Sequence, residues 1–221
     1  MVRDPLIIIP ARLGSKGIPN KNFRLLNGRS PLDRAIDCAK LAGFSNIVVT
    51  TDHPDTALLP GNLLGMAPLH TDTCSMVDVV LDVLQRVPGS DDQRVLLAQP
   101  TQPLRQPKHL HMAIGLLFHY YSVASVIGVE PAAKLYYRRA DAFESILTQT
   151  VERRQEAFPT FACDGTIYGF QRWWFLAHRI FHSPSTYMLR IPKSEACRLD
   201  DLEDWAIAEQ RVPAYQHNSV V

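Results

Sequence analysis

The sequence predicts an α/β protein of three layers, in which a mostly parallel, twisted sheet carries helices on both faces. Short apolar runs bounded by breakers, such as residues 6–9, are typical of strands buried on both faces of a parallel sheet. These runs alternate with stretches of helical spacing, the pattern of repeated strand-helix units. A chain of 221 residues is long enough for one large domain. We therefore predict a single domain over residues 1–221, with a more polar insertion at residues 131–160.

The first half of the chain predicts helices between its strands. Apolar residues recur at helical spacing over residues 30–44, and a glycine near their end fits a C-terminal cap. Residues 46–52 predict a second buried strand, which ends in an acidic residue. Residues 53–74 hold too much proline and glycine for regular structure. Residues 76–87 predict a helix with valine and leucine on its inner face.

The second half continues this alternation. Residues 94–100 predict a third strand, and residues 107–121 predict a helix with proline in its first turn. Residues 122–130 and 165–170 predict two further strands, one on each side of the insertion. Residues 199–212 predict a last helix, because acidic residues stand at its start, where the helix dipole favours them.

The composition is that of an ordinary soluble protein. With 46% hydrophobic residues, 20% charged residues and a net charge of +1, neither nucleic acid nor a membrane surface is expected as a partner. No apolar run approaches the roughly 18 residues of a membrane span, and the N-terminus lacks a signal-peptide layout. We therefore expect a cytoplasmic protein. Its four cysteines are widely spaced without a C-x-x-C pair, which indicates free thiols.

A cationic loop with two glycines follows the first strand, at residues 10–22. Open α/β sheets bind ligands at the carboxyl ends of their strands. Backbone N–H groups of such a loop can converge on phosphate oxygens, Lys16 and Lys21 can neutralise a triphosphate, and Arg12 can clamp it. The spacing matches neither G-x-G-x-x-G nor G-x-x-x-x-G-K-[ST], so neither a dinucleotide fold nor an ordinary ATPase is supported. The loop predicts a nucleotide site, with a solvated basic turn as the alternative.

Six motifs occur in order along the chain: PAR-x-GSKGIP-x-KN, TTD, TDTCS, LLAQPTQPLR, DGTIYGF and LDDLEDWAIAE. Together they resemble the CMP-N-acetylneuraminate synthetase (acylneuraminate cytidylyltransferase) family, the CMP-sugar-acid synthetases, with relatives for other nonulosonic acids and Kdo. The resemblance spans roughly residues 5–210. It implies a nucleotide-diphospho-sugar transferase-like fold, CMP transfer from CTP to a sialic-acid-like sugar acid, pyrophosphate release and Mg²⁺ as cofactor. It also implies a homodimer formed through the insertion at 131–160.

The resemblance also implies which residues hold CTP. They are Ala11, Arg12, Gly14, Ser15, Lys16, Gly17, Lys21, Asn22 and Ser75. Arg12 and Lys21 would stabilise charge as pyrophosphate leaves, and Asp200 would complete the catalytic set. No covalent role is expected, because positioning and electrostatics supply most of the catalysis in phosphoryl transfer.

The acceptor site implied by the resemblance draws on three regions. Its residues are Gln99, Thr101, Arg105, Arg154, Gln155, Asp164 and Tyr168. Arg154 and Gln155 belong to the insertion and would reach the partner subunit's site. A buried strand tyrosine is an equal alternative for Tyr168.

The metal motif departs from the family. Many members carry D-I-D-x-x-x-D near the end, whereas Arg198 replaces the first aspartate here, and Asp200 and Asp204 keep the other two. Mg²⁺ is typically held by one or two carboxylates together with substrate phosphates, so Asp200 is the expected metal ligand, with help from Asp201. Two alternatives stay open: Arg198 takes over part of the metal's role at a phosphate oxygen, or the acidic residues merely open a helix.

The acceptor side departs as well. Where sialic-acid enzymes read F-R-P-N-G, this chain reads Phe161-Ala162-Cys163-Asp164-Gly165, so an arginine is lost and an asparagine becomes an acid. Because a charge-assisted hydrogen bond contributes about 1.5–3 kcal/mol, we expect weaker binding of a carboxylated sugar. Three hypotheses stay open: a sugar-acid synthetase, a cytidylyltransferase for another acceptor such as a phosphonate or unusual sugar, and a non-catalytic nucleotide-binding homologue.

Overall fold

A computed structural model describes residues 4–15, 17–54, 62–65, 74–129, 136–139, 142–145 and 160–213 of the chain. The three four-residue segments are described by their backbone alone. Lys16, Arg154, Gln155 and most of the predicted insertion lie outside the described residues. No helix within these ranges is long and apolar enough to cross a membrane.

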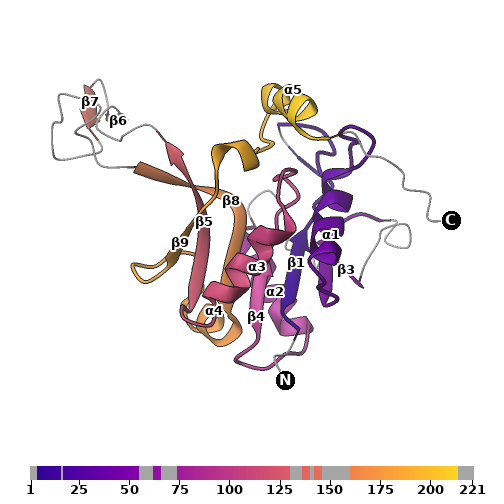
Figure 1. Ribbon diagram of the computed structural model, residues 1–221, viewed down its shortest axis with the longest axis vertical. Helices are drawn as coiled ribbons and strands as arrows, with labels where there is room; N and C mark the ends of the chain where they lie inside the picture. The colour runs from indigo at the N-terminus through magenta and orange to yellow at the C-terminus, as the bar shows by residue number, and fades with distance from the viewer. Residues whose placement is uncertain are drawn as a thin grey trace.

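Seven strands form one sheet in the order β3-β2-β1-β4-β8-β5-β9 (Figure 1). They are β1 (Leu6–Pro10), β2 (Ile47–Thr51), β3 (Asn62–Gly65), β4 (Arg94–Leu97), β5 (Ser122–Val129), β8 (Thr160–Gln171) and β9 (Tyr187–Arg190). The pairs β3-β2, β2-β1, β1-β4 and β5-β9 are parallel, whereas β8 is antiparallel to both β4 and β5. Only β8 therefore runs against the common direction of this sheet, and the predicted mostly parallel sheet is confirmed. Within the predicted insertion, β6 (Tyr136–Arg139) and β7 (Ala142–Ser145) form a separate antiparallel pair.

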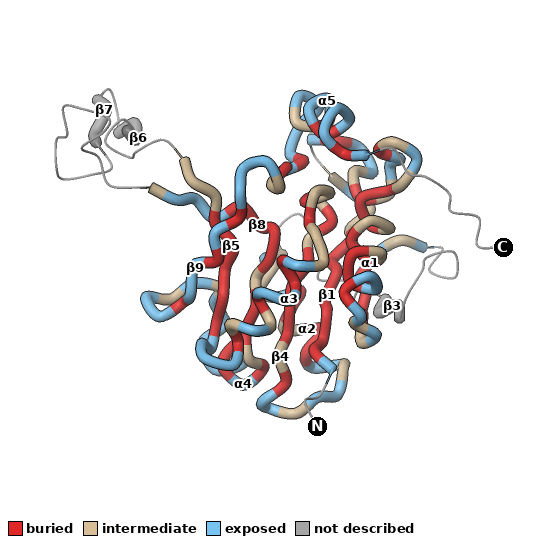
Figure 2. The backbone as a smooth tube through the Cα atoms, in the orientation of Figure 1, coloured by how far each residue is buried: buried red, intermediate tan, exposed pale blue. Residues whose placement is uncertain are grey.

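Helices cover both faces of the sheet. They are α1 (Pro31–Leu41), α2 (Met76–Arg86), α3 (Pro107–Leu116), α4 (Arg172–His178) and, at the end of the chain, α5 (Leu202–Arg211). Successive residues of a strand point to opposite faces. Ile7 and Ile9 of β1 accordingly belong to a core cluster with residues of α1 and α3, and Leu6 and Ile8 to a second cluster with residues of α2 and α4. Because both faces of β1 are covered, its sequence is a continuous apolar run, and the strand is buried throughout (Figure 2).

A third, smaller cluster joins the opening loop to the end of the chain. Ile18 and Leu26 from the loop pack with Leu199 and with Trp205 and Ala208 of α5. Fully burying a large apolar side chain contributes about 1.5–3 kcal/mol, so this cluster is sufficient to hold α5 against the loop. The two segments that carry the predicted catalytic residues are thereby brought together.

The helix starts are fixed by local signals in the sequence. The Ser30 hydroxyl accepts a hydrogen bond from the Asp33 N–H at the start of α1, and Pro31 occupies the first helical position. Asp201 caps α5 in the same way, by accepting from the Asp204 N–H at 2.9 Å. These caps explain why the predicted helices begin within three residues of the observed ones.

Parts of the predicted fold are wrong or incomplete. Residues 53–74, predicted to be irregular, include β3, whose four residues are too few to stand out among prolines and glycines. α3 ends five residues before the predicted boundary at 121, because Gly115 weakens its last turn. The strand predicted at 165–170 begins at Thr160. Neither α4 nor β9 had been predicted.

Candidate active site

The predicted nucleotide loop leaves the carboxyl end of β1, at the edge of the sheet where α5 also lies (Figure 1). Two hydrogen bonds fix the course of this loop. Asp52, directly after β2, accepts from the Leu13 N–H at 2.6 Å. Asn22 donates from Nδ2 to the Arg12 carbonyl at 3.0 Å. The acid after β2 and the buried Asn22 therefore shape the loop itself, and the Oδ1 atom of Asn22 makes no hydrogen bond within the described part of the chain.

Lys21 joins the loop to the C-terminal segment. Its Nζ donates to the Leu199 carbonyl at 2.5 Å and lies 3.9 Å from Asp200 Oδ1. Arg198 binds the other oxygen of that carboxylate, with 2.7 Å between Nε and Oδ2. Gly17 shows how closely the two segments approach, because an added Cβ there would lie 2.1 Å from the Asp200 carbonyl oxygen. The structure thus brings Lys21 and Asp200, predicted from distant motifs, into one cluster.

Burial lowers the pKa of Lys21 from its ordinary value of 10.5. Asp200 opposes this shift, and the positive charges of Arg198 and Arg12 add to it. A cation that is partly desolvated and surrounded by like charge gains more than an exposed one when an anion binds beside it. Lys21, Arg12 and Arg198 thus form a local cluster of positive charge, and the role of Arg12 and Lys21 toward a phosphate stays a prediction.

Other residues predicted to hold CTP differ in what they offer. The Ala11 N–H donates to the Thr50 carbonyl at 2.8 Å and its side chain is buried, so both are engaged within the fold. Gly14 has open space where a side chain would stand. Ser75 caps α2, where its hydroxyl and Asp78 form a reciprocal capping box. The roles of these residues, and of Ser15, toward CTP stay predictions.

Gln99 and Tyr168, both predicted to face the acceptor, approach Gly165, where the backbone has φ +77°, and Gln102 lies beside them. A methyl group on Gly165 would lie 3.8 Å from Gln102 Nε2, 3.9 Å from the Tyr168 hydroxyl and 4.0 Å from Gln99 Oε1. Tyr168 is half-buried, and burial raises its pKa. Tyr168 lies in β8 and packs against the second core cluster, so its role toward an acceptor stays a prediction beside the alternative of a buried strand tyrosine.

Arg105, Asp164 and Thr101 have internal partners instead. Arg105 is buried and donates to the carbonyls of Thr166, at 2.7 Å, and of Gln99. Burial lowers its pKa to about 10, which keeps it protonated at neutral pH. The Asp164 carboxylate accepts from the N–H and hydroxyl of Thr166. The Thr101 carbonyl accepts from the Leu199 N–H at 3.0 Å. These contacts tie β4, β8 and the C-terminal segment together, and contacts with an acceptor stay predictions.

A pocket of about 350 Å³ adjoins the Lys21 cluster. Its wall combines residues of β8 with the C-terminal segment: Gln102, Ala162, Cys163, Asp164, Lys193, Ala196, Cys197, Arg198 and Arg211, together with Ile127. Cys163 and Cys197 are free thiols like the other two cysteines, as predicted. Sequence reasoning missed Lys193 and Arg211, because they lie 18 residues apart and no motif joins them.

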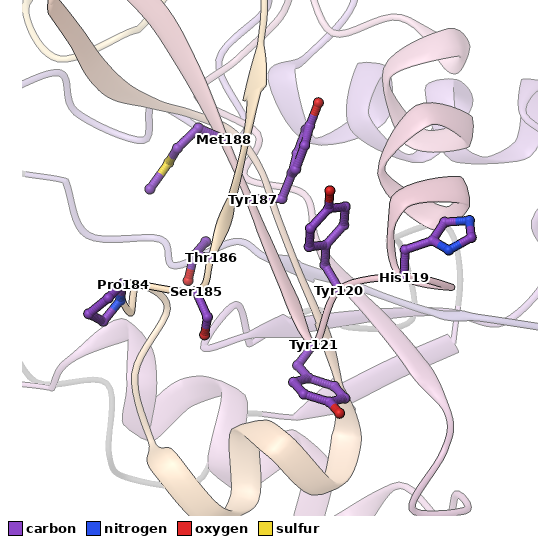
Figure 3. Close-up of a pocket in the computed structure, with 8 residues that line it drawn as sticks. All are labelled: His119, Tyr120, Tyr121, Pro184, Ser185, Thr186, Tyr187 and Met188. Carbon is purple, nitrogen blue, oxygen red and sulfur yellow. The ribbon is translucent and has the colours of Figure 1, made fainter.

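A second pocket, of about 520 Å³, lies at the amino ends of β5 and β9 (Figure 3). Three tyrosines and a histidine make up half of its eight lining residues, and the rings of Tyr120 and Tyr187 lie side by side, 4.6 Å apart between centroids. None of the predicted site residues lines it. The smaller pocket, at the carboxyl edge of the sheet, is therefore the one that belongs to the candidate active site.

The described residues contain no group of three or more side chains arranged to hold a metal ion. Asp204 Oδ2 accepts from the Asp200 N–H at 2.9 Å, and Asp201 caps α5. Asp200 is thus the one carboxylate of this motif that is turned toward Lys21 and Arg198. One carboxylate fits Mg²⁺ only where substrate phosphates complete the ligand set.

Residues 6–152 match the family model described as Cytidylyltransferase, which is more than half of the chain. The chain belongs to the cytidylyltransferase family. Members of this family are nucleotidyltransferase enzymes, and the resemblance drawn from the six motifs is confirmed. The matched range includes Arg12 and Lys21 of this cytidylyltransferase but ends before Asp164, Arg198 and Asp200.

Relatives of this cytidylyltransferase extend the match to nearly the whole chain. A CMP-N,N'-diacetyllegionaminic acid synthase from Legionella pneumophila is 29% identical over 93% of this chain and 94% of its own. An N-acylneuraminate cytidylyltransferase from Streptococcus agalactiae is 30% identical over 91% of this chain, which spans about half (51%) of that relative. A solved structure of CMP:2-keto-3-deoxy-manno-octonic acid synthetase complexed with CTP superposes with a TM-score of 0.69 at 15% identity, over 94% of this chain and 98% of its own. That likeness confirms the fold.

Proposed function

We propose that the chain transfers CMP from CTP to a hydroxyl group of a sugar acid and releases pyrophosphate. One observation carries this proposal: Lys21 of the nucleotide loop lies beside Asp200, which pairs with Arg198. Arg198 also lines the pocket of about 350 Å³, which we call the cationic pocket because Lys193, Arg198 and Arg211 stand in its wall. The loop that we propose to bind the triphosphate and the pocket that we propose to bind the acid therefore lie next to each other. The relatives named for N,N'-diacetyllegionaminic acid and N-acylneuraminate support a sugar acid as the acceptor class.

The reaction needs no covalent intermediate on the protein. The acceptor hydroxyl oxygen forms a bond to the α-phosphorus of CTP, the bond from that phosphorus to the bridging oxygen breaks, and the hydroxyl proton is released. Pyrophosphate leaves with the bonding electron pair and with additional negative charge. Lys21 and Arg12 stabilise that charge, an electrostatic effect that is strong where water is partly excluded.

Asp200 is the residue we infer to hold Mg²⁺, together with phosphate oxygens of CTP. When bound, Mg²⁺ would neutralise charge on the triphosphate. Arg198 pairs with the same carboxylate, so Asp200 could hold the metal only where this ion pair is given up. An exposed ion pair of this kind contributes little, about 0–1 kcal/mol, and is easily exchanged.

We also infer a homodimer that forms through residues 131–160, and a cytoplasmic enzyme. The first follows from the resemblance of the insertion, with Arg154 and Gln155 contributed to the site of the partner subunit. The second carries over the expectation drawn from the sequence.

Pyrophosphate release tests the proposed function. The chain is incubated with Mg²⁺, one of CTP, UTP, ATP or GTP, and one acid of a panel: N-acetylneuraminate, N,N'-diacetyllegionaminate or Kdo. We expect release with CTP and at least one acid, and little with UTP, because a site built on hydrogen bonds to one base rejects a base that leaves them unpaired. Equal turnover with UTP would refute cytidine selectivity. A phosphonate is tested in the same way, and release with it alone would instead favour the alternative acceptor class.

A further inference from the structure

More positive than negative side chains line the pocket beside Lys21. Lys193, Arg198 and Arg211 line it, against one carboxylate, Asp164. The Asp164 carboxylate accepts hydrogen bonds from Thr166, and Asp200, beside the pocket, pairs with Arg198, so three cations stand against two carboxylates. An anionic ligand would therefore complete the charge of this pocket.

We propose that Arg198 and Lys193, supported by Arg211, bind the acidic group of the acceptor and make this enzyme selective for charged acceptors. The inference rests on the proposed function and names a determinant of its substrate class. It replaces the expectation that the loss of the family's arginine, which is Ala162 here, weakens the binding of an acid. Ala162 of β8 lines the same pocket as Arg198 of the C-terminal segment. Arg198 therefore brings a positive charge to the pocket in which the family's arginine is replaced by Ala162.

The segment that carries these cations is held in place from several sides. Lys193 and Glu195 belong to a 3₁₀ turn, Lys193–Glu195. Glu195 forms an ion pair with Lys108 at 2.5 Å and a hydrogen bond with the buried His109 at 2.7 Å, both at the start of α3. Arg211 donates to the Lys193 carbonyl at 2.8 Å. These contacts fix the backbone that carries the cations, so the conformational freedom lost on binding is mainly that of the charged side chains themselves.

The pocket also fits a hydroxylated ligand. Gln102 lines it and is 3% exposed. Its Nε2 donates to the Asp164 carbonyl, whereas its Oε1 has no hydrogen-bond partner among the described residues. A buried carbonyl oxygen without a donor is costly, and a hydroxyl or amide N–H of the ligand would satisfy it. An acid that also carries such donors, as a sugar acid does, matches both features.

The geometry places the acid next to the nucleotide. Arg198 reaches Asp200 at 2.7 Å, and Asp200 is 3.9 Å from Lys21. An anion held by Arg198 is thus separated from Lys21 by the width of one carboxylate. That distance suits an acceptor whose reacting hydroxyl lies close to its acidic group.

The test compares an acid with its neutral methyl ester at saturating CTP. The acid is whichever of N-acetylneuraminate, N,N'-diacetyllegionaminate and Kdo the wild type turns over fastest. The variants are Arg198→Ala, Lys193→Ala and their combination, with Lys40→Ala, an exposed cation of α1, as the matched control. We expect each single substitution to raise the KM for the acid about 10- to 100-fold. The KM for the ester and the unfolding temperature should change little, and Lys40→Ala should behave as the wild type.

The combined variant decides the inference. In it, the preference for the acid over its ester should disappear, and Ala162→Arg, added on the opposite part of the pocket wall, should restore part of that preference. An unchanged acid-to-ester ratio in a folded combined variant that still turns over the acid would overturn the assignment. A wild type that turns over none of the acids contradicts the proposed function, and this inference then falls with it.

Discussion

Lys21 is the residue on which the candidate site depends. Its side chain is 15% exposed, and its ammonium is held by the Leu199 carbonyl and by Asp200. A hydrogen bond to a charged group contributes about 1.5–3 kcal/mol, so Lys21 is positioned before any ligand arrives. Pre-positioned charge acts on the transition state without reorganisation, which is the condition for a large catalytic effect.

Replacing Lys21 separates catalysis from binding. If Lys21 acts on charge that develops as pyrophosphate leaves, Lys21→Ala should lower kcat about 100-fold and change the KM for CTP much less. Steady-state kinetics with pyrophosphate detection measure both constants. A rise in KM alone would show that Lys21 only contacts the phosphates of the ground state.

The pH dependence of activity reports the state of Lys21. Burial and the nearby arginines lower its pKa, so the alkaline limb of kcat/KM for CTP should fall below pH 10.5. Arg198→Ala removes one lowering charge and should move this limb to higher pH. A limb that does not move would assign it to another group.

Gly17 is required by close approach, because a Cβ on it would meet the Asp200 carbonyl at 2.1 Å. Gly17→Ala should push the loop away from the C-terminal segment and cost about 1–3 kcal/mol in the free energy of unfolding, together with most of the activity. Chemical denaturation and turnover are measured side by side. Gly115→Ala, whose methyl would meet nothing within 4 Å, is the control and should keep full activity.

Asp200 carries the metal assignment. Asp200→Asn removes the ligand charge with little change of shape, so turnover that depends on Mg²⁺ should be abolished while the unfolding temperature stays close to the wild type. Titration of activity against Mg²⁺ measures the effect. Near-normal turnover in this variant would place the metal on phosphates and water alone.

At the scale of elements, the 3₁₀ turn and α3 are joined by a buried histidine. His109 Nδ1 accepts from the Gln106 N–H at 3.2 Å, so Nε2 carries the proton that is donated to Glu195 at 2.7 Å. Burial lowers the pKa of His109, and hydrogen bonds from Lys108 and His109 lower the pKa of Glu195. The neutral histidine and the ionised glutamate together hold the turn that presents Lys193.

These shifts predict acid lability. Both pKa values are lower in the folded protein, so the stabilisation is present at neutral pH and is lost as pH falls, first below 6.5 for His109 and then below 4.5 for Glu195. The free energy of unfolding, measured by denaturation between pH 7 and pH 4, should decrease accordingly. His109→Gln cannot take up the proton and should flatten this dependence between pH 6.5 and 4.5. An unchanged slope would show that other groups cause the loss.

Elements with strong local signals could be predicted, and the others could not. α1 begins with serine and proline before an apolar period, and β1 is a continuous apolar run, so both were predicted close to their bounds. β3 and β9 have four residues each and draw their stability from their neighbours β2 and β5. The reversed direction of β8 is likewise set by its tertiary pairing with β4 and β5.

At the scale of the whole molecule, the candidate site is assembled from both ends of the chain. The third core cluster packs the opening loop against α5, and this contact places Lys21 beside Asp200. Motif order along the sequence predicted that both residues serve one site. The cationic pocket was not predicted, because Lys193, Arg198 and Arg211 meet only through the folding of the C-terminal segment around β8.

The product of the reaction tests the central claim most directly. The chain, CTP, Mg²⁺ and each acid of the panel are incubated, and the products are identified by phosphorus NMR and mass spectrometry. The account predicts equal amounts of pyrophosphate and of a phosphodiester whose mass is that of the acid plus CMP less one water. CTP that stays intact with every acid, or that is only hydrolysed to free CMP or CDP, would contradict it.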